Sequence, residues 1–331
     1  MLGPVRRVDT FLQNYKIKAM TWMEIPPSRF EQVEEDHERL SHNQVEFFAQ
    51  EEDIIFHSPE GPWAAKSAPL RILSFDIEEM VAPNAGFPRY DHEPIIQIGN
   101  MLAIKGDLHP YSRCIFTLNT CSRIEGAEVR SFNHESTMLR AWRDFVVETD
   151  PDLIVGFNIG AFDFPQLILR AKTLGLVEFA YLGRLKAVPA TAEPLAVNKR
   201  SLKDAPILAG RLQLDLLQHL RESNIKRTTK ELTWNGQPKC DLNTVSWEFL
   251  GQRKEEIHHM KINPLQQGGP EDRRQLAVYC LKDTHLPLLL LECPELRCLD
   301  ESIDAARASS LYMYRPFGLF LRNGRNERTQ Y

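Results

Sequence analysis

Two acidic side chains on one predicted strand could bind a metal ion. Asp76 and Glu78 stand two residues apart in the apolar segment 70–78, which predicts a strand. Side chains at positions i and i+2 of a strand lie on the same face, so both carboxylates project together, while Phe75 and Ile77 face the core. Two neighbouring carboxylates repel each other unless a cation lies between them, and oxygen ligands favour Mg²⁺ or Mn²⁺. The alternative is a solvated strand edge that binds nothing.

A third carboxylate, Asp163, stands where a strand is expected to turn into a helix. The predicted strand ends at Phe157, and a helix over residues 164–174 follows, with Pro165 in its first turn. In α/β sheets, active sites form at the ends of strands. The alternative is a helix N-cap, in which the Asp163 carboxylate accepts hydrogen bonds from the free N–H groups of the first helical turn.

A fourth carboxylate, Asp283, lies on a long predicted helix. Tyr279 and Asp283 stand four residues apart, so they share one face of that helix. Leu276 and Cys280 lie on the same side, which makes it the buried face of the helix. An ionised aspartate is costly to bury unless it is paired or binds a metal. This position therefore also suggests a metal ligand.

Alternating strands and helices are expected to bring these residues together. Apolar runs predict the strands, and helical periodicity predicts the helices. Pro287 is expected to interrupt the last helix, because it has no N–H to donate to the carbonyl of Asp283. Strands joined by crossover helices indicate an α/β fold with a mixed sheet and flanking helices. The predicted strands are 70–78, 94–99, 112–118, 153–157 and 212–216, and the predicted helices are 134–148, 164–174 and 273–291.

Composition places the chain among ordinary globular proteins. Its 331 residues suggest two domains, or one domain with an appendage, and 43% of them are hydrophobic and 26% charged. Lys and Arg number 40 against 45 Asp and Glu, and the net charge of −5 argues against a nucleic-acid binder that works through an overall positive field. The charge is uneven, however. Residues 24–53 are rich in acids, which indicates a solvated helix or loop face, and residues 183–230 are rich in bases.

Cysteine usage and hydropathy bear on the compartment. The six cysteines form no C-x-x-C pair, which argues against a ribbon-type zinc site and fits a reducing environment. The first residues lack the apolar core of a signal peptide, and no apolar run reaches the roughly 18 residues of a membrane span. We therefore expect an intracellular protein that is neither secreted nor associated with a membrane.

Taken together, the three acidic motifs resemble those of a known family. Their order is D-x-E ending at Glu78, N-x-x-x-F-D ending at Asp163, and Y-x-x-x-D ending at Asp283. With the segments around them, they resemble the 3′–5′ exonuclease domain of family B DNA polymerases, most closely of the delta type. The likeness runs from about Trp63 to about Leu290.

The resemblance implies a ribonuclease H-like (DnaQ-like) α/β fold in which four carboxylates hold two divalent cations, Mg²⁺ or Mn²⁺. Two metals about 3.5–4 Å apart can activate a water and stabilise the entering and leaving oxygens of a phosphodiester. Tyr279 would orient the attacking water or the scissile phosphate, and Val278, which stands where another branch of the family has histidine, indicates the tyrosine type. The matching metal positions are Asp76, Glu78, Asp163 and Asp283.

The resemblance also implies how DNA is held. Asn158 and Phe162 match residues that hold the frayed 3′ end, with Phe162 as an apolar wedge against a base. The basic residues within 184–230 match a region that helps to part the primer strand from the template, where they would meet phosphates. A solvated loop is the alternative for some of them. Glu79 replaces the family's usual cysteine and is expected to add a carboxylate near the metals.

The function that the resemblance implies is hydrolysis of the 3′-terminal nucleotide of single-stranded or frayed primer–template DNA during replication in the nucleus. Other replicative polymerase subunits and a sliding clamp are the implied partners. We expect a partial N-terminal domain over 1–62, an exonuclease domain over 63–291 with an insertion at 227–240, and a divergent tail over 292–331. Polymerase activity is not expected, because no polymerase palm motif is present. A catalytically silent chain that keeps a nucleic-acid-binding fold, and an exonuclease acting on RNA, are the other hypotheses.

Overall fold

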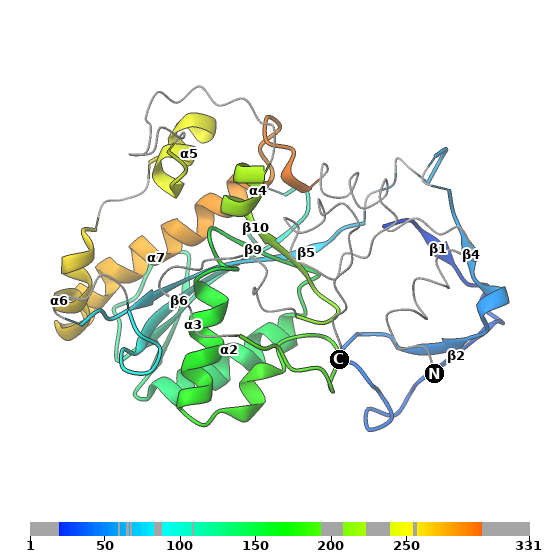
Figure 1. Ribbon diagram of the computed structural model, residues 1–331, viewed down its shortest axis with the longest axis horizontal. Helices are drawn as coiled ribbons and strands as arrows, with labels where there is room; N and C mark the ends of the chain where they lie inside the picture. Colours follow the sequence, from blue (N-terminus) through cyan, green and yellow to red (C-terminus); the bar gives the residue numbers. More distant parts are fainter. Residues whose placement is uncertain are drawn as a thin grey trace, which may run out of the picture.

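A mixed sheet with helices on both faces forms the body of the protein, as Figure 1 shows. This arrangement confirms the predicted α/β fold. The computed structural model describes residues 20–299, apart from 59, 64, 65, 67, 83–87, 108, 193–207, 223–238 and 254–256.

The central sheet has six strands in the order β10-β9-β5-β6-β7-β8. β10, β9 and β5 run parallel, β6 is antiparallel to both β5 and β7, and β8 is parallel to β7. The carboxyl ends of β5, β9 and β10 therefore share one edge of the sheet. The bounds are β5 Arg71–Glu79, β6 Ile95–Ile104, β7 Ser112–Leu118, β8 Glu128–Phe132, β9 Leu153–Gly156 and β10 Leu212–Asp215.

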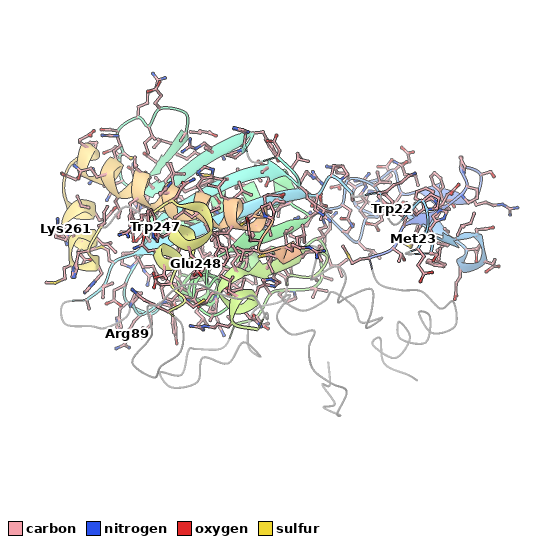
Figure 2. The ribbon with its side chains drawn as sticks, turned by 90° about the horizontal axis from the view of Figure 1, so that it is seen from above. Trp22, Met23, Arg89, Trp247, Glu248 and Lys261 are labelled. Carbon is pink, nitrogen blue, oxygen red and sulfur yellow. The ribbon has the colours of Figure 1, made fainter. Side chains whose placement is uncertain are left out.

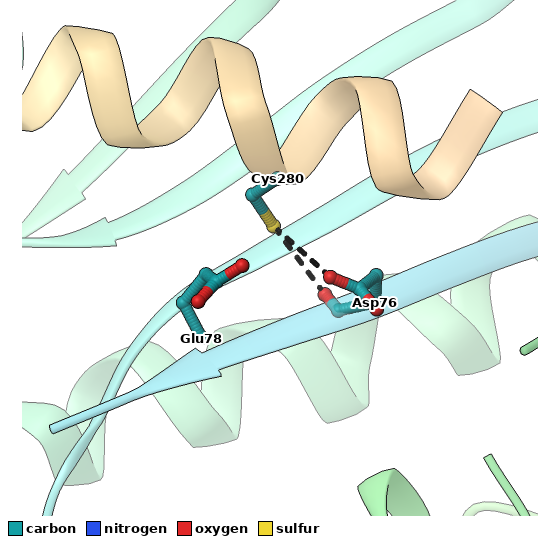
Figure 3. Close-up of side chains that lie close together, drawn as sticks. All are labelled: Asp76, Glu78 and Cys280. Atoms are coloured by element: carbon teal, nitrogen blue, oxygen red, sulfur yellow. Dashed lines mark hydrogen bonds between the residues drawn. The ribbon is translucent and has the colours of Figure 1, made fainter. Parts of the chain in front are cut away.

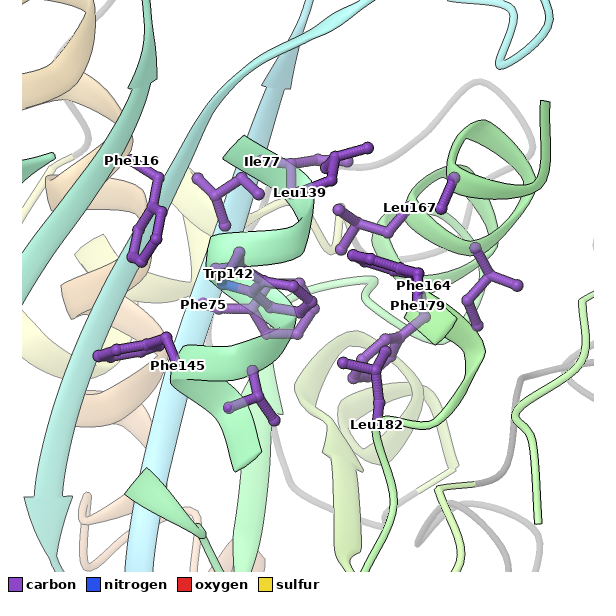
Figure 4. Packing of buried hydrophobic residues seen from close by; sticks show 14 of the residues in the cluster. Phe75, Ile77, Phe116, Leu139, Trp142, Phe145, Phe164, Leu167, Phe179 and Leu182 are labelled. Atoms are coloured by element: carbon purple, nitrogen blue, oxygen red, sulfur yellow. The ribbon is translucent and has the colours of Figure 1, made fainter. Parts of the chain in front are cut away.

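One face of the sheet is covered by α2 (Glu135–Thr149) and α3 (Asp163–Thr173). Phe75 of β5 is completely buried against them, with ring centroids 5.4 Å from Trp142 and 4.9 Å from Phe164 (Figure 4). The odd-numbered side chains of β5 therefore enter this aromatic core, as the strand periodicity predicts.

The opposite face is covered by α7 (Pro270–Leu291). Ile72 belongs to the core cluster on this side, and the Ser74 hydroxyl donates a hydrogen bond to the carbonyl of Thr284 at 2.7 Å. The even-numbered side chains of β5 thus face α7. Since Asp76 and Glu78 continue this even-numbered series, the strand directs both carboxylates toward the same helix.

Shorter elements surround this body. The two N-terminal hairpin-like pairs, β1 with β4 and β2 with β3, are antiparallel, and Figure 2 shows Trp22 and Met23 at the far end of the molecule from Lys261. Only Glu24 and Glu31 of the acidic run 24–53 lie on these strands, and the other acids of the run lie on loops and turns, in agreement with the predicted solvated face. The bounds are β1 Met23–Glu24, β2 Phe30–Gln32, β3 Phe47–Ala49, β4 Ile55–Phe56, α4 Leu216–Glu222, α5 Leu242–Leu250 and α6 Ile262–Gln267, with 3-10 turns at Glu51–Asp53, Val177–Ala180 and His259–Lys261.

Some side chains of the predicted basic region form ion pairs within the protein. Arg211 and Arg184 both donate to the Asp150 carboxylate, at 2.7 and 2.8 Å, and the Arg211 side chain is fully buried. Although burial raises the pKa of Asp150, hydrogen bonds from these arginines hold it below its ordinary value. Lys186 approaches Asp36 at 3.6 Å. Arg184 and Arg211 thus hold the chain together through a buried ion pair, whereas the pair of Lys186 is exposed. Other bases of the region, Lys199, Arg200, Lys203, Lys226, Arg227 and Lys230, lie outside the described residues.

All the predicted strands and helices are present, but the sequence analysis did not predict β1 to β4, β8, α4, α5 and α6. α7 begins at Pro270, earlier than predicted, and continues past Pro287 to Leu291. Proline removes only one helical hydrogen bond, and Leu288, Leu290 and Leu291 are buried in the core, so packing keeps the last turn helical. The described start of the segment 292–331 also enters this core, through Cys293, Leu296, Cys298 and Leu299.

Candidate active site

The site begins with two carboxylates on β5. Asp76 is half-buried and Glu78 is 7% exposed, while Phe75 and Ile77 point into the opposite core. The prediction that Asp76 and Glu78 share one face is therefore confirmed. Figure 3 shows both side chains beneath α7, on the side of the strand that faces Cys280.

Cys280 of α7 completes the cluster. Its Sγ lies 3.6 Å from the Asp76 carbonyl oxygen and 3.9 Å from Asp76 Oδ2 (Figure 3). One ligand atom each of Asp76, Glu78 and Cys280 can be chosen so that all lie within 4.8 Å of one another. Burial, followed by the negative charges of Asp76, Glu78 and Asp283, raises the pKa of the Cys280 thiol well above its ordinary value. A neutral thiol is a poor ligand for Mg²⁺, so the oxygens are the donors that fit a hard cation.

Asp283 lies three residues beyond Cys280 on α7. Its side chain is 3% exposed, and its charge acts on Cys280 together with those of Asp76 and Glu78. Tyr279 is also buried, among Ile96 and neighbouring apolar residues of α6 and α7. The buried face that the sequence predicts for this helix is therefore confirmed.

Asp163 is the first residue of α3 and is 3% exposed. Its Oδ1 accepts a hydrogen bond from the Ile77 N–H of β5 at 3.2 Å. β9 pairs with β5 only as far as Ser74. The Ile77 N–H therefore donates to the Asp163 carboxylate in place of a backbone carbonyl of β9. The N-cap of α3 is Phe162, so Asp163 is not the N-cap that the alternative reading expected.

The environment of Asp163 opposes its negative charge. Burial raises the pKa of Asp163 well above its ordinary value, and the nearby charges of Asp215 and Glu79 raise it further, against the backbone hydrogen bond from Ile77. A carboxyl in this position ionises readily only when positive charge is brought to it. That requirement agrees with the chemistry of a metal ligand.

Asn158 and Phe162 lie on the turn between β9 and α3, and both are half-buried. Asn158 adopts the left-handed conformation with φ of 72°, which asparagine tolerates better than most residues. Its carbonyl accepts hydrogen bonds from the N–H groups of Ala161 at 3.2 Å and Phe162 at 3.0 Å. The turn thus brings Phe162 next to Asp163 at the carboxyl edge of the sheet.

Glu79 does not join the cluster under α7, although its charge acts on Asp163. The charges that act most strongly on it are those of Glu135 in α2 and Arg170 in α3, on the other face of the sheet. It is 5% exposed, and neither carboxylate oxygen has a hydrogen-bond partner among the described residues. Burial is the main cause that raises the pKa of Glu79 to about 8. The alternation of β5 accounts for this orientation.

Two residues that the sequence did not single out shape the site. Gly99 of β6 lies opposite Asp76, and a Cβ there would come within 3.0 Å of Cys280 Sγ and closer still to Thr284 Oγ1. Glycine therefore lets α7 approach the sheet. Asp215 ends β10 and is buried beside the turn that carries Asn158. Its place at the end of a predicted parallel strand was the signal that could have revealed it.

The architecture and the acidic cluster can now be compared with known proteins. A family model described as "DNA polymerase family B, exonuclease domain" matches residues 5–233. The chain belongs to this family. The ribonuclease H-like fold expected from the acidic motifs is thereby confirmed.

Curated relatives carry the name DNA polymerase delta catalytic subunit. The chain is 40% identical over 314 residues to that of Candida albicans, which covers 93% of this chain and 28% of the relative. It is 37% identical over 320 residues to that of Arabidopsis thaliana (96% and 27%) and over 320 residues to that of Mesocricetus auratus (95% and 27%). The predicted likeness to the delta type is confirmed. The chain spans just over a quarter of the length of these relatives. The alignments also include most of the residues before 63 and after 291.

None of the helices in the described part of the chain combines the length and apolar character that a bilayer crossing demands.

Gly99→Ala should loosen the contact between β6 and α7. The new methyl group would meet Thr284 Oγ1 and Cys280 Sγ, and we expect a loss of about 1–3 kcal/mol in the free energy of unfolding. Urea denaturation measures this. Adding Thr284→Ala removes the closest atom, and its hydroxyl otherwise bonds only within α7, to the Cys280 carbonyl. The double variant should therefore recover part of the loss, and an equal or larger loss in the double variant would contradict this account of Gly99.

Glu79→Gln should stabilise the protein in a pH-dependent way. The folded-state pKa of about 8 lies above the ordinary value of 4.5, so the unfolded chain loses this proton at lower pH than the folded one. The wild type therefore loses stability as the pH rises from about 5 to 8, and the variant lacks this loss. We expect the variant's advantage to grow over that interval to the order of a few kcal/mol.

Urea denaturation at several pH values, in EDTA, measures the difference between Glu79→Gln and the wild type. Glu125→Gln, at an exposed glutamate, is the control and should show no such trend. A difference that stays constant between pH 5 and 8 would contradict the buried, unpartnered environment assigned to Glu79.

Proposed function

We propose that this chain is a metal-dependent 3′–5′ exonuclease that hydrolyses the 3′-terminal nucleotide of single-stranded or frayed DNA. The observation that carries the proposal is the pair of carboxylates, Asp76 and Glu78, gathered beside Cys280 beneath α7, where the charge of Asp283 also acts. Membership of the exonuclease family of family B polymerases supports the same reaction. Proofreading during DNA replication is the role that this reaction would serve.

The residues proposed to hold the metal ions are all carboxylates, namely Asp76, Glu78, Asp163 and Asp283. Burial and the charges of Asp215 and Glu79 oppose ionisation of Asp163, which supports its role as a ligand of a cation, and Asp283 is likewise buried. Two divalent cations, Mg²⁺ or Mn²⁺, would supply a polarised water and stabilise negative charge on the phosphodiester. The protein's part is to hold these oxygens close together on a rigid strand and a rigid helix.

Other residues are proposed to orient the substrate. Tyr279, buried on the same helix as Asp283, would orient the water or the scissile phosphate through its hydroxyl. Asn158 and Phe162 would hold the terminal nucleotide, with the Phe162 ring against a base. Stacking of this kind contributes about 1–3 kcal/mol per base and does not depend on sequence.

The wider setting follows from the relatives' names alone. By analogy with polymerase delta catalytic subunits, we propose a nuclear protein of DNA replication that acts on primer–template DNA. Other polymerase subunits and a sliding clamp are the proposed partners.

Asp76→Ala/Glu78→Ala should abolish hydrolysis. Loss of the two carboxylates under α7 removes the oxygens that would hold the cations, an effect of several kcal/mol that corresponds to at least about a thousandfold in rate. A 5′-labelled single-stranded DNA oligonucleotide with Mg²⁺ or Mn²⁺ measures the rate and shows shortening from the 3′ end, and an RNA oligonucleotide tests the competing substrate.

The surface variant Asp144→Asn is the control and should retain the wild-type rate, since among the described residues Asp144 pairs only with the neighbouring Arg143, at the exposed side of α2. Equal, slow degradation by the wild type and the double variant would reject catalysis. Binding of the oligonucleotide without hydrolysis would instead favour a catalytically silent binding module.

A further inference from the structure

Asp215 is a buried carboxylate with four backbone donors. Its Oδ1 accepts hydrogen bonds from the N–H groups of Asn158 at 2.9 Å, Leu217 at 3.0 Å and Gln218 at 3.4 Å, and its Oδ2 accepts from Gly160 at 3.0 Å. The residue is 4% exposed. Two of these donors belong to the first turn of α4, directly after Asp215. The other two belong to the turn between β9 and α3, more than fifty residues away in the sequence.

The position of Asp215 in the sheet explains why it reaches this turn. β9 lies between β10 and β5, and all three are parallel, so the turn leaves the carboxyl end of the middle strand. Asp215 holds the turn from the β10 side. On the β5 side, Asp163 Oδ1 accepts a hydrogen bond from the Ile77 N–H. The turn is therefore fixed from both neighbouring strands.

The hydrogen bonds continue from Asp215 to Phe162. The Asn158 N–H donates to Asp215, and the Asn158 carbonyl accepts from the Phe162 N–H at 3.0 Å. Asn158 is held in the left-handed conformation by this pair of bonds. Without the carboxylate, Asn158 would be free to return to a more common conformation, and Phe162 would move with it.

We propose that Asp215 is a positioning residue that fixes the turn from Asn158 to Phe162 in the conformation that receives the 3′ end of a single-stranded DNA. This inference rests on the proposed function. It differs from a purely structural role, in which Asp215 would only cap α4, because a cap affects folding and leaves the affinity for DNA unchanged.

Asp215→Asn separates the two roles. Asparagine is as good an N-cap as aspartate, so its oxygen can keep the bonds to α4 and to Asn158. Its NH₂ group would then face the Gly160 N–H, donor against donor. We expect thermal stability close to that of the wild type and an affinity for single-stranded DNA about tenfold lower, the effect of losing one hydrogen bond to a charged group.

The affinity is measured by fluorescence anisotropy of a short 5′-fluorescein-labelled oligothymidylate in EDTA, which prevents hydrolysis. Asp241→Asn is the matched control, because Asp241 caps α5 through Thr244 and does not touch the turn. It should leave the affinity unchanged. If Asp215→Asn does not fold, Asp215→Ser, which keeps one short capping oxygen, takes its place.

A double-mutant cycle with Phe162→Ala tests whether Asp215 acts through this ring. In the Phe162→Ala background, Asp215→Asn should weaken binding about threefold or less. The proposal is overturned if the wild type binds no oligonucleotide, if Asp215→Asn binds as tightly as the wild type, or if the two substitutions act additively. If binding weakens as expected but no variant hydrolyses DNA, the positioning role stands and the proposed nuclease function fails.

Discussion

The protein must keep several carboxylates buried near the ends of its central strands. Each buried charge is costly unless it has a partner, and the structure provides partners of different kinds. Arginines pair with Asp150, and four backbone N–H groups surround Asp215. Burial, followed by the charges of Asp76, Glu78 and Asp283, raises the pKa of the Cys280 thiol beneath α7. A divalent cation is the partner that would best offset this arrangement.

Close packing brings these groups together from segments distant in the sequence. β5 supplies Asp76 and Glu78, while α7 supplies Asp283 from more than two hundred residues further along the chain. The approach of this helix depends on Gly99, because any side chain there would meet the helix. The hydrogen bond from Ile77 to Asp163 fixes the start of α3 against the same strand. The site is thus as rigid as the core on either side of it.

Strand and helix periodicity, with the acidic motifs, sufficed to predict the sheet, the faces of β5 and α7 and the shared position of Asp76 and Glu78. The same alternation, applied one residue further, places Glu79 on the opposite face of the strand, where its charge acts on Asp163. The partners of Arg184 and the backbone donors of Asp215 lie on segments distant in the sequence. Such tertiary contacts cannot be predicted from local sequence patterns. The boundaries at 63 and 291 stay predictions.

The central claim is that the buried carboxylates form a site for two divalent cations. Isothermal titration with Mn²⁺ tests it most directly, with Asp163→Asn as the comparison, because that change keeps the oxygen that accepts from Ile77 and removes only the charge. We predict two Mn²⁺ per wild-type chain and loss of at least one in the variant. Binding of no Mn²⁺ by the wild type, or of two by Asp163→Asn with unchanged affinity, would contradict the account.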